Sequence, residues 1–243
     1  MTTATLEPQA TAVSTTHTNH STNNSNHNHG IHSNGHRTAA NVNVAATNGN
    51  GAANGGYDET RRTVAAGQIE IDPATGLPFL KDVHFADFNI SDSLKAKLAA
   101  AGFKTPTPVQ AKGLAPGLEG ADILATASTG TGQTLSFLIP MIEHMDATSA
   151  PSTKGKRGPI RALILLPTRE LAMQVLEAYA KLVPNAKNDA VLVCGGLSEN
   201  TQLDQLGRGP RLVVATPGRL EDFLRRRAVN INAVEMLVLD EVD

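Results

Sequence analysis

Several residue types that usually identify a protein class are scarce in this sequence. Tryptophan is absent, aromatic residues make up 3% of the 243 residues, and Cys194 is the single cysteine. A core built from this chain must be aliphatic, and no disulfide can form within it, which is typical of a reducing compartment. No apolar run approaches the roughly 18 residues of a membrane helix, and the N-terminus lacks the apolar segment of a secretory signal. We therefore expect a cytoplasmic location and no membrane association.

A strong charge of one sign is also missing. The formal net charge is -2 at pH 7, so no overall basic field indicates a nucleic-acid partner. Any prediction of nucleic-acid binding must therefore rest on motifs.

Residues 1–56 form a low-complexity tail of Thr, Asn, Ser, His, Ala and Gly. With few large apolar side chains, this tail cannot offset the entropy lost on folding, so we predict that it is disordered. Most of the histidines lie in it, namely His17, His20, His27, His29, His32 and His36. Their spacing is irregular and no cysteine accompanies them, which favours a spacer or a protein-interaction tail over a metal-binding tract. Residues 57–84 are interpreted as a linker or short extension, in which Ile69 and Ile71 alternate with polar residues and predict a short strand or hairpin edge.

From Phe85 to Asp243 the pattern becomes that of a globular domain. Continuous apolar runs predict buried strands at 122–126, 161–166, 189–194, 211–215 and 235–239. Helical stretches at 133–145, 168–181, 199–206 and 218–227 lie between them, and Ser91 and Thr107 are predicted to cap two earlier helices. Strands alternating with helices favour an α/β fold with a parallel sheet buried on both faces. The chain stops at the end of a predicted core strand, so we expect the domain to be incomplete at its C-terminus.

The segment 127–134, read as ASTGTGQT, lies between an apolar strand and a helix. Strand, glycine-rich turn and helix is the arrangement that binds phosphates, because Gly130 and Gly132 bring backbone N–H groups to an anion at a helix N-terminus. Thr134 supplies the hydroxyl that such a loop offers to Mg²⁺, whereas Gln133 stands where the general pattern has lysine. The predicted nucleotide-binding residues of this loop are Ser128, Thr129, Gly130, Thr131, Gly132, Gln133 and Thr134.

Two carboxylates, Asp240 and Glu241, follow the last predicted strand. Ligands of open α/β sheets bind outside the carboxyl ends of the strands. Asp240 is therefore predicted to hold Mg²⁺, and Glu241 to orient and polarise an attacking water. Together with Gln133, they are the predicted catalytic residues for a nucleoside triphosphate.

These motifs, in this order, resemble the first RecA-like domain of a DEAD-box ATP-dependent RNA helicase. Phe85 and the segment 102–110 are similar to the family's Q motif, and 240–243 reads DEVD where the family has DEAD. The resemblance implies that Gln110 contacts the adenine edge, that Phe103 stacks on the base, and that Phe85 helps to wall the pocket. An amide side chain suits that edge because it donates and accepts at once.

Three further segments resemble the family's RNA-binding motifs. The residues implied are Pro167, Thr168, Arg169, Gly195, Gly196, Thr216, Pro217, Gly218 and Arg219. Glycine amides, threonine hydroxyls, helix N-termini and arginines hold phosphates and sugars without reading bases. Arg169 could instead tie the sheet end together, and the run 225–227 is interpreted as a solvated helix end.

The resemblance implies ATP and Mg²⁺ as ligands and single-stranded RNA or a short duplex as partner. The first hypothesis is an ATP-dependent RNA helicase of which this chain is a fragment with weak or no activity, because Gln133 replaces the lysine and no second RecA-like domain is present. The alternative is a non-hydrolysing nucleotide- or RNA-binding module. A metal-binding protein acting through its histidine tail is the third hypothesis.

Overall fold

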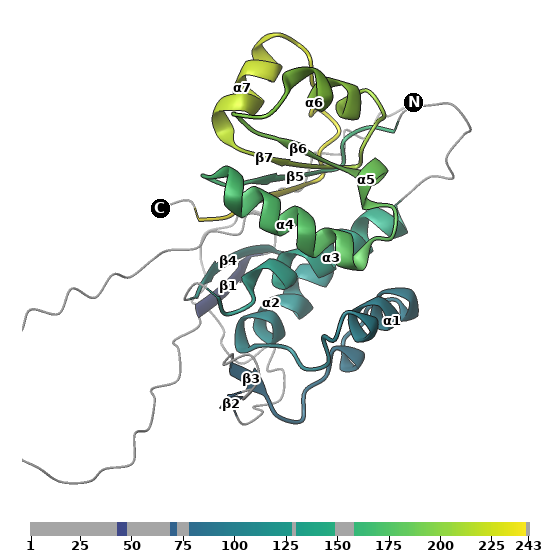
Figure 1. The fold of residues 1–243 in the computed structure, drawn as a ribbon. Coiled ribbons are helices and arrows are strands. Elements are labelled where there is room, and N and C mark those ends of the chain that lie inside the picture. The colour runs from purple at the N-terminus through teal and green to yellow at the C-terminus, as the bar shows by residue number, and fades with distance from the viewer. Residues whose placement is uncertain (1–42, 48–68, 72–77, 128–129, 149–157, 242–243) are drawn as a thin grey trace, which may run out of the picture.

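A four-stranded parallel sheet organises the chain, in the order β6-β7-β5-β8 (Figure 1). The computed structural model describes residues 43–47, 69–71, 78–127, 130–148 and 158–241, with only the backbone described for 43–47. The strands are β5 (Ala162–Leu165), β6 (Ala190–Val193), β7 (Leu212–Ala215) and β8 (Met236–Leu239). In the register of the central strand, Leu163 lies opposite Val213 on one side and Leu237 on the other. This arrangement confirms the predicted parallel sheet.

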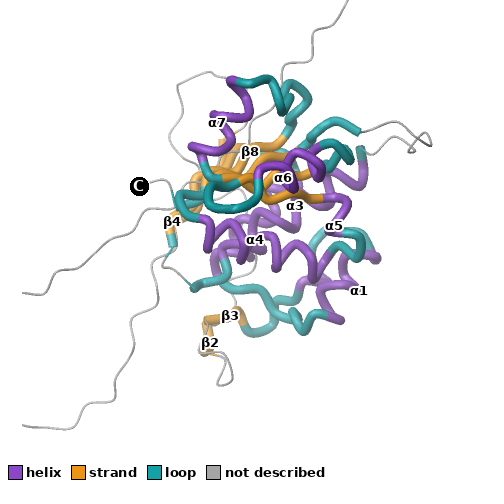
Figure 2. Tube along the Cα trace, turned by 45° about the horizontal axis from the view of Figure 1, so that its top comes forward, coloured by secondary structure: helices purple, strands orange, loops and turns teal. Residues whose placement is uncertain are grey.

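Both faces of the sheet are covered by helices, as Figures 1 and 2 show. Ile164, Val214 and Val238 belong to the larger core, with α1 (Asp92–Ala100), α2 (Pro108–Leu118), α3 (Gln133–Ala147) and α4 (Arg169–Leu182). Leu163 and Val213 belong to a second core, which α6 (Glu199–Leu206) and α7 (Pro217–Arg225) cover. Because successive strand residues point to opposite faces, a strand between two cores must be apolar at every position. This explains the continuous apolar runs of the sequence.

Polar side chains start the helices where the sequence predicted caps. The Ser91 hydroxyl accepts a hydrogen bond from the backbone N–H of Leu94, and the Thr107 hydroxyl accepts one from that of Gln110. Two short helices, η1 (Phe85–Asp87) and α5 (Ala186–Asp189), were not predicted. The expected hairpin is present, since β2 (Ile69–Ile71) pairs antiparallel with β3 (Pro78–Leu80). Among the described residues, no helix has both the length and the apolar character to cross a bilayer.

The strand that precedes the glycine-rich loop, β4 (Asp122–Thr126), is not part of the parallel sheet. It pairs antiparallel with β1 (Asn43–Thr47), five residues of the tail that the sequence predicted to be disordered. Backbone N–H and C=O groups need partners, and β1 supplies them along one edge of β4. The rest of the predicted tail lies outside the described residues.

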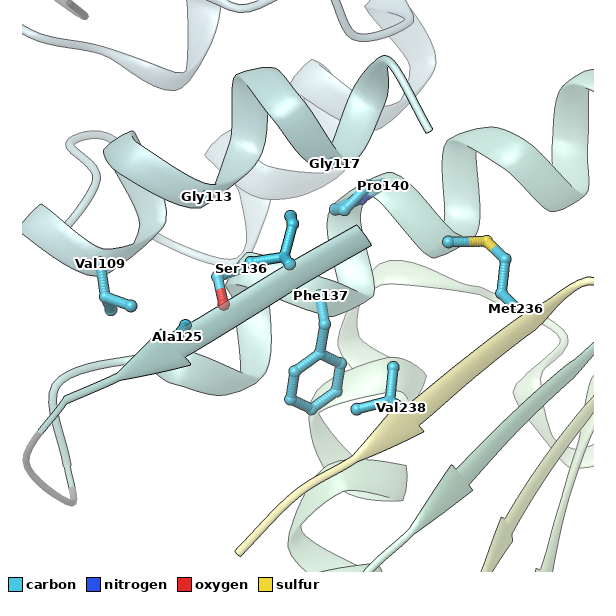
Figure 3. A pocket seen from close by; sticks show the side chains of 10 residues that line it. Val109, Gly113, Gly117, Ala125, Ser136, Phe137, Pro140, Met236 and Val238 are labelled. Atoms are coloured by element: carbon cyan, nitrogen blue, oxygen red, sulfur yellow. The ribbon is translucent and has the colours of Figure 1, made fainter. Parts of the chain in front are cut away.

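An apolar slot separates β4 from β8 (Figure 3). Its cavity volume is about 10 Å³, so it is a narrow gap between side chains, and it is partly open to solvent. Its lining comes from α2, β4, α3 and β8: Val109, Gly113, Gly117, Ile123, Ala125, Ser136, Phe137, Pro140, Met236 and Val238. In the described part of the chain, β8 pairs only with β5 and β4 only with β1. The two strands are therefore joined across the slot by side-chain packing.

Candidate functional site

Most of the predicted site residues follow the carboxyl ends of the parallel strands. Backbone hydrogen bonds align these ends, since Thr216 N donates to Val193 O and Asp240 N donates to Leu165 O, both at 3.0 Å. In Figure 3, the arrows of the strands that carry Ala125 and Val238 point in the same direction. The loop after β4 and the acids after β8 therefore lie toward the same end of the fold.

The glycine-rich loop has a backbone that only glycine adopts easily. Gly130 and Gly132 have φ angles of +82° and +86°, in the left-handed region. A Cβ on Gly132 would lie 2.5 Å from Gln110 Nε2 and within 3.3 Å of the Thr107 side chain. A Cβ on Gly130 would meet no atom within 4 Å. Gly132 is therefore required by both conformation and space, and Gly130 by conformation alone.

Gln133, the residue in place of lysine, is buried and turned toward the protein. Its side-chain Nε2 donates a hydrogen bond to the main-chain O of Ala127 at 3.1 Å. The main-chain O of Gln133 accepts a hydrogen bond from Ser136 Oγ at 2.6 Å. The side chain thus ties the first residue of helix α3 to the start of the loop. The buried Thr131 and the half-buried Thr134 lie on either side of this turn, and Ser128 and Thr129 lie outside the described residues.

Gln110 connects the first turn of α2 to the same loop. Its Oε1 accepts from Thr107 N at 2.9 Å, and its Nε2 donates to Gly132 O at 2.7 Å. Both ends of the amide therefore have partners within the protein. Each end still has capacity for one more hydrogen bond, since the oxygen accepts two and the NH2 group donates two. Contact of this amide with adenine stays a prediction.

The two aromatic residues implied in adenine binding differ in their surroundings. Phe103 is half-buried and packs against the larger core, so part of its ring reaches the surface. Phe85 is 3% exposed and belongs to that core, and its N–H donates to Lys104 O at 3.1 Å. Phe85 therefore supports the segment before α2 from beneath, whereas Phe103 is the ring available for stacking.

Asp240 and Glu241 lie where β8 ends. Asp240 is buried and Glu241 is half-buried. Glu241 has a φ of +55°, an uncommon conformation for a residue with a side chain that costs of order 1 kcal/mol or more. Such residues gather at functional sites. Val242 and Asp243 lie outside the described residues.

The oxygen atoms near this edge suit Mg²⁺ better than a metal held by protein alone. The described residues contain no group of three His, Cys, Asp or Glu side chains that could enclose a metal. Mg²⁺ keeps several waters and is usually bound through one or two carboxylates plus substrate phosphates. A buried carboxylate at Asp240 and a hydroxyl at Thr134 fit that mode of binding.

The predicted RNA-binding residues lie around the ends of β5, β6 and β7. Pro167, Pro217 and Gly218 are exposed at the N-termini of α4 and α7, where the helix dipoles favour an anion. Thr168 Oγ1 accepts from Leu171 N at 3.3 Å and so caps α4. Thr216 precedes α7 without a side-chain cap. The edge therefore presents two helix N-termini side by side in the sheet order.

Two arginines join this edge near Cys194. Gly195 and Gly196 are exposed, and Gly196 has a φ of +76°. A Cβ on Gly196 would lie 3.3 Å from Arg169 Nη1. Burial raises the pKa of the Cys194 thiol, against the opposing effect of the Arg169 and Arg219 charges. The structure therefore brings Gly196 and Arg169 together at this edge.

Sequence reasoning missed a charged cluster around Phe223. The guanidinium carbons of Arg219 and Arg226 lie 5.4 and 5.3 Å from the centre of its ring. Glu199 lies 2.7 Å from Arg226 and 3.8 Å from Arg219, between nearest charged atoms. Residues 225–227 are exposed, as predicted for a solvated helix end, but Arg226 is also ion-paired and contacts the Phe223 ring. The signal was a phenylalanine at helical spacing from two arginines, four residues after one and three before the other.

Three comparisons with known proteins give consistent results. The DEAD/DEAH box helicase family matches residues 107–243. The DEAD-box ATP-dependent RNA helicase 30 of Arabidopsis thaliana is 41% identical over 159 residues, which is 65% of this chain and 26% of that protein. The crystal structure of a DEAD box protein from the hyperthermophile Methanococcus jannaschii superposes with a TM-score of 0.55 at 32% identity, over 66% of this chain and 42% of that one. The chain thus spans about a quarter of the plant protein and less than half of the archaeal one.

Proposed function

Because the chain belongs to the DEAD/DEAH box helicase family, we propose that its functional edge binds ATP with Mg²⁺ and the backbone of single-stranded RNA or a short duplex. The observation that carries this proposal is the common location of the motifs. The loop after β4, the acids after β8 and the exposed helix N-termini after β5 and β7 lie toward one end of the fold. A nucleotide and an RNA strand bound there would be neighbours, as an ATP-dependent RNA helicase requires.

Each residue has a physical role in this proposal. The amides at Gly130 and Gly132 and the N-terminus of α3 would hold phosphates. Asp240 and Thr134 would hold Mg²⁺, which when bound neutralises charge on the phosphate oxygens. Glu241 would accept a hydrogen bond from the attacking water and orient it. Phe103 would stack on adenine, while Gln110 would recognise its edge.

The RNA contacts would be independent of base sequence. Gly195, Gly196, Thr216 and the N-termini of α4 and α7 offer donors for phosphate and sugar oxygens. Arg169 and Arg219 would add positive charge at the same edge. Affinity for RNA would therefore fall with salt and vary little among sequences.

We propose that hydrolysis by this chain is weak. Lysine at position 133 would give a charge-assisted hydrogen bond to phosphate, whereas the Gln133 amide is neutral and donates to Ala127 O. This contact favours the second candidate, a domain that binds nucleotide or RNA without turnover. In a whole protein of the family, strand separation would involve the further RecA-like domain that the resemblance implies. We therefore expect no strand separation by the 243-residue chain alone. The tail is proposed to serve as a spacer or to bind protein partners.

The test is titration of the chain with ATP and ADP in Mg²⁺, with and without a labelled single-stranded RNA, alongside phosphate release. Binding of both nucleotides with phosphate release near background would support the non-hydrolysing module for this chain. RNA-stimulated phosphate release would support the active enzyme. Failure to bind either nucleotide at millimolar concentration would contradict the proposal, and a strand-displacement assay checks the expectation on unwinding.

A further inference from the structure

Glu199 is an acidic side chain within the predicted RNA-binding edge. It is the first residue of α6 and follows the Gly195–Gly196 turn. Its two carboxylate oxygens face different arginines, with Oε1 at 2.7 Å from Arg226 Nη1 and Oε2 at 3.8 Å from Arg219 Nη1. The carboxylate therefore connects the start of α6 to Arg219 in the first turn of α7 and to Arg226 directly after the end of that helix.

We propose that Glu199 occupies the position of an RNA phosphate between Arg219 and Arg226 and thereby lowers the affinity of this edge for RNA. This inference rests on the proposed RNA binding at the same edge. It adds an internal competitor that none of the sequence motifs includes.

The two arginines are held in place before any RNA binds. Both guanidinium groups lie within cation–π distance of the Phe223 ring, and Phe223 is fully buried. Arg226 Nη2 also lies 3.1 Å from Asp222 Oδ2. A pair of arginines fixed on a buried ring loses little side-chain entropy when it takes up an anion.

Arg219 has donor capacity that the cluster does not use. Its side chain is 19% exposed, and its buried Nη1 has no hydrogen-bond partner among the described residues. The Glu199 carboxylate is too far away, at 3.8 Å, to form a hydrogen bond with it. A buried donor without a partner is costly, so an anion that reaches both arginines would satisfy it.

Carboxylate and phosphodiester are equivalent in charge at this position. Each carries one negative charge, and both accept hydrogen bonds from a guanidinium group in the same forked geometry. The Glu199 side chain is 39% exposed, so it can turn into solvent when a phosphate arrives. The exchange leaves the charge of the arginine pair balanced, but Glu199 must give up its contact with Arg226.

The experiment compares Glu199→Gln with the natural chain in binding a labelled single-stranded oligouridine between 50 and 200 mM salt. Glutamine keeps the shape and removes the charge. We expect about three- to tenfold tighter binding at low salt, and a steeper salt dependence, by roughly 0.7 in the log–log slope for each additional phosphate bound. Unchanged or weaker binding by Glu199→Gln would overturn the inference, because Glu199 would then serve to order the arginines.

Glu221→Gln is the matched control. Glu221 is also a glutamate of α7, but at 100° per residue it lies on the side of the helix opposite Arg219 and Phe223. It pairs with Arg225 in an exposed i, i+4 contact at 3.1 Å. The change in net charge is the same, so a general electrostatic effect would raise the affinity of both variants equally. Equal gains in the two variants would also overturn the inference.

Elution from immobilised heparin separates this inference from the RNA proposal. If no protein binds the oligouridine, the proposed RNA function fails. Later elution of Glu199→Gln than of both the natural chain and Glu221→Gln would still support an internal competitor for anions. Elution of all three at one salt concentration would reject it.

Discussion

Gln110 Nε2 and the carbonyl O of Gly132 are joined by a 2.7 Å hydrogen bond. The side-chain amide of Gln110, in the first turn of α2, thus holds the glycine that directly precedes α3. The other end of the same amide accepts from Thr107 N, so the helix start and the loop are one hydrogen-bonded unit. Changes on either side of this bond should affect both stability and nucleotide binding.

Replacement of Gly132 by alanine should disrupt this unit. The new Cβ would lie 2.5 Å from Gln110 Nε2 in a backbone with φ at +86°. We expect a loss of about 2–4 kcal/mol in unfolding free energy, the sum of left-handed strain and overpacking, with weaker ATP binding. Urea unfolding and nucleotide titration measure both.

Gly130→Ala is the control for Gly132→Ala. Gly130 has a similar φ, +82°, but a Cβ there meets open space. Its cost should be limited to about 1 kcal/mol of backbone strain. Equal losses in the two variants would show that contact with Gln110 is unimportant.

Replacement of Gln133 by lysine should strengthen ATP binding. The lysine adds a charge-assisted contact with phosphate, which contributes roughly 1.5–3 kcal/mol to binding. It should therefore lower the ATP Kd about tenfold or more. If the contact also strengthens in the transition state, turnover in a protein with the complete site should rise on the order of 10²–10³. Isothermal titration and phosphate release measure these effects.

Gln133→Ala separates the charge from the loop contact. It removes the hydrogen bond to Ala127 O without adding a positive charge. No gain in ATP affinity is expected from it. If Gln133→Lys behaves like this alanine variant, position 133 is not what limits nucleotide binding.

A partly buried ionic network should make Arg211 important for stability. Arg211 Nε and Nη2 donate to the two carboxylate oxygens of Asp189 at 2.6 and 2.8 Å, and the Tyr179 hydroxyl donates to the same carboxylate. Burial, and then the Asp189 contact, raise the pKa of Tyr179, so its hydroxyl stays protonated and donates. Arg211→Ala leaves Asp189 without its cation and should cost about 2–4 kcal/mol.

Tyr179→Phe should cost less than Arg211→Ala, about 1–2 kcal/mol, because the Arg211–Asp189 pair stays intact. Arg208→Ala, at an exposed arginine after α6, should change the unfolding free energy by at most about 0.5 kcal/mol. Urea denaturation of the three variants gives the ranking. A larger loss for Tyr179→Phe than for Arg211→Ala would contradict this account of the network.

Glu235 should give stability that depends on pH. Its Oε2 lies 2.5 Å from Arg161 Nη2 and 2.8 Å from His144 Nε2. Burial acts to raise the pKa of Glu235, but the hydrogen bonds from Arg161 and His144 prevail and lower it. Because the pKa of Glu235 is lower in the folded state, its ionised carboxylate stabilises the folded protein at pH values above the unfolded-state pKa of about 4.3. This stabilisation is lost as the pH falls through the folded-state pKa.

Glu235→Gln should therefore cost about 1 kcal/mol at pH 7, and the difference from the natural chain should shrink below about pH 4. Unfolding by urea at pH 7, 5 and 3.5 measures it. Glu177→Gln, at an exposed glutamate of α4, is the control and should be close to neutral throughout. A Glu235→Gln cost that persists unchanged at pH 3.5 would exclude the ion pairs as its source.

Local patterns predicted the elements of the main sheet because each strand lies between two cores and several helices begin at a side-chain cap. The run at 211–215 and the Thr107 cap carry these signals within a few residues. Pairing between distant segments has no such signal. Nothing near Asn43 predicts that it would lie beside the end of β4, and the polar composition around it favoured disorder.

Side-chain direction was the other limit of prediction. Residue type placed Gln110 and Gln133 in the nucleotide site, but the hydrogen bonds of their amides depend on the backbone path of the loop. Gln133 turns inward to Ala127 O directly after Gly132, a residue in the left-handed conformation. The pairing of Glu199 with Arg226 depends on the spacing of two helices, which no local pattern contains.

The slot between β4 and β8 has a mechanical consequence. Among the described residues, no ladder of backbone hydrogen bonds ties β4, which precedes the glycine-rich loop, to β8, which precedes the acids. Their separation is held by the packing of side chains such as Phe137 and Val238, which can slide at lower cost than a ladder can break. A nucleotide whose metal contacts both Thr134 and Asp240 would link the two strands and restrict their relative movement. The increase in melting temperature when nucleotide is added would then measure how mobile β4 and β8 are relative to each other without it.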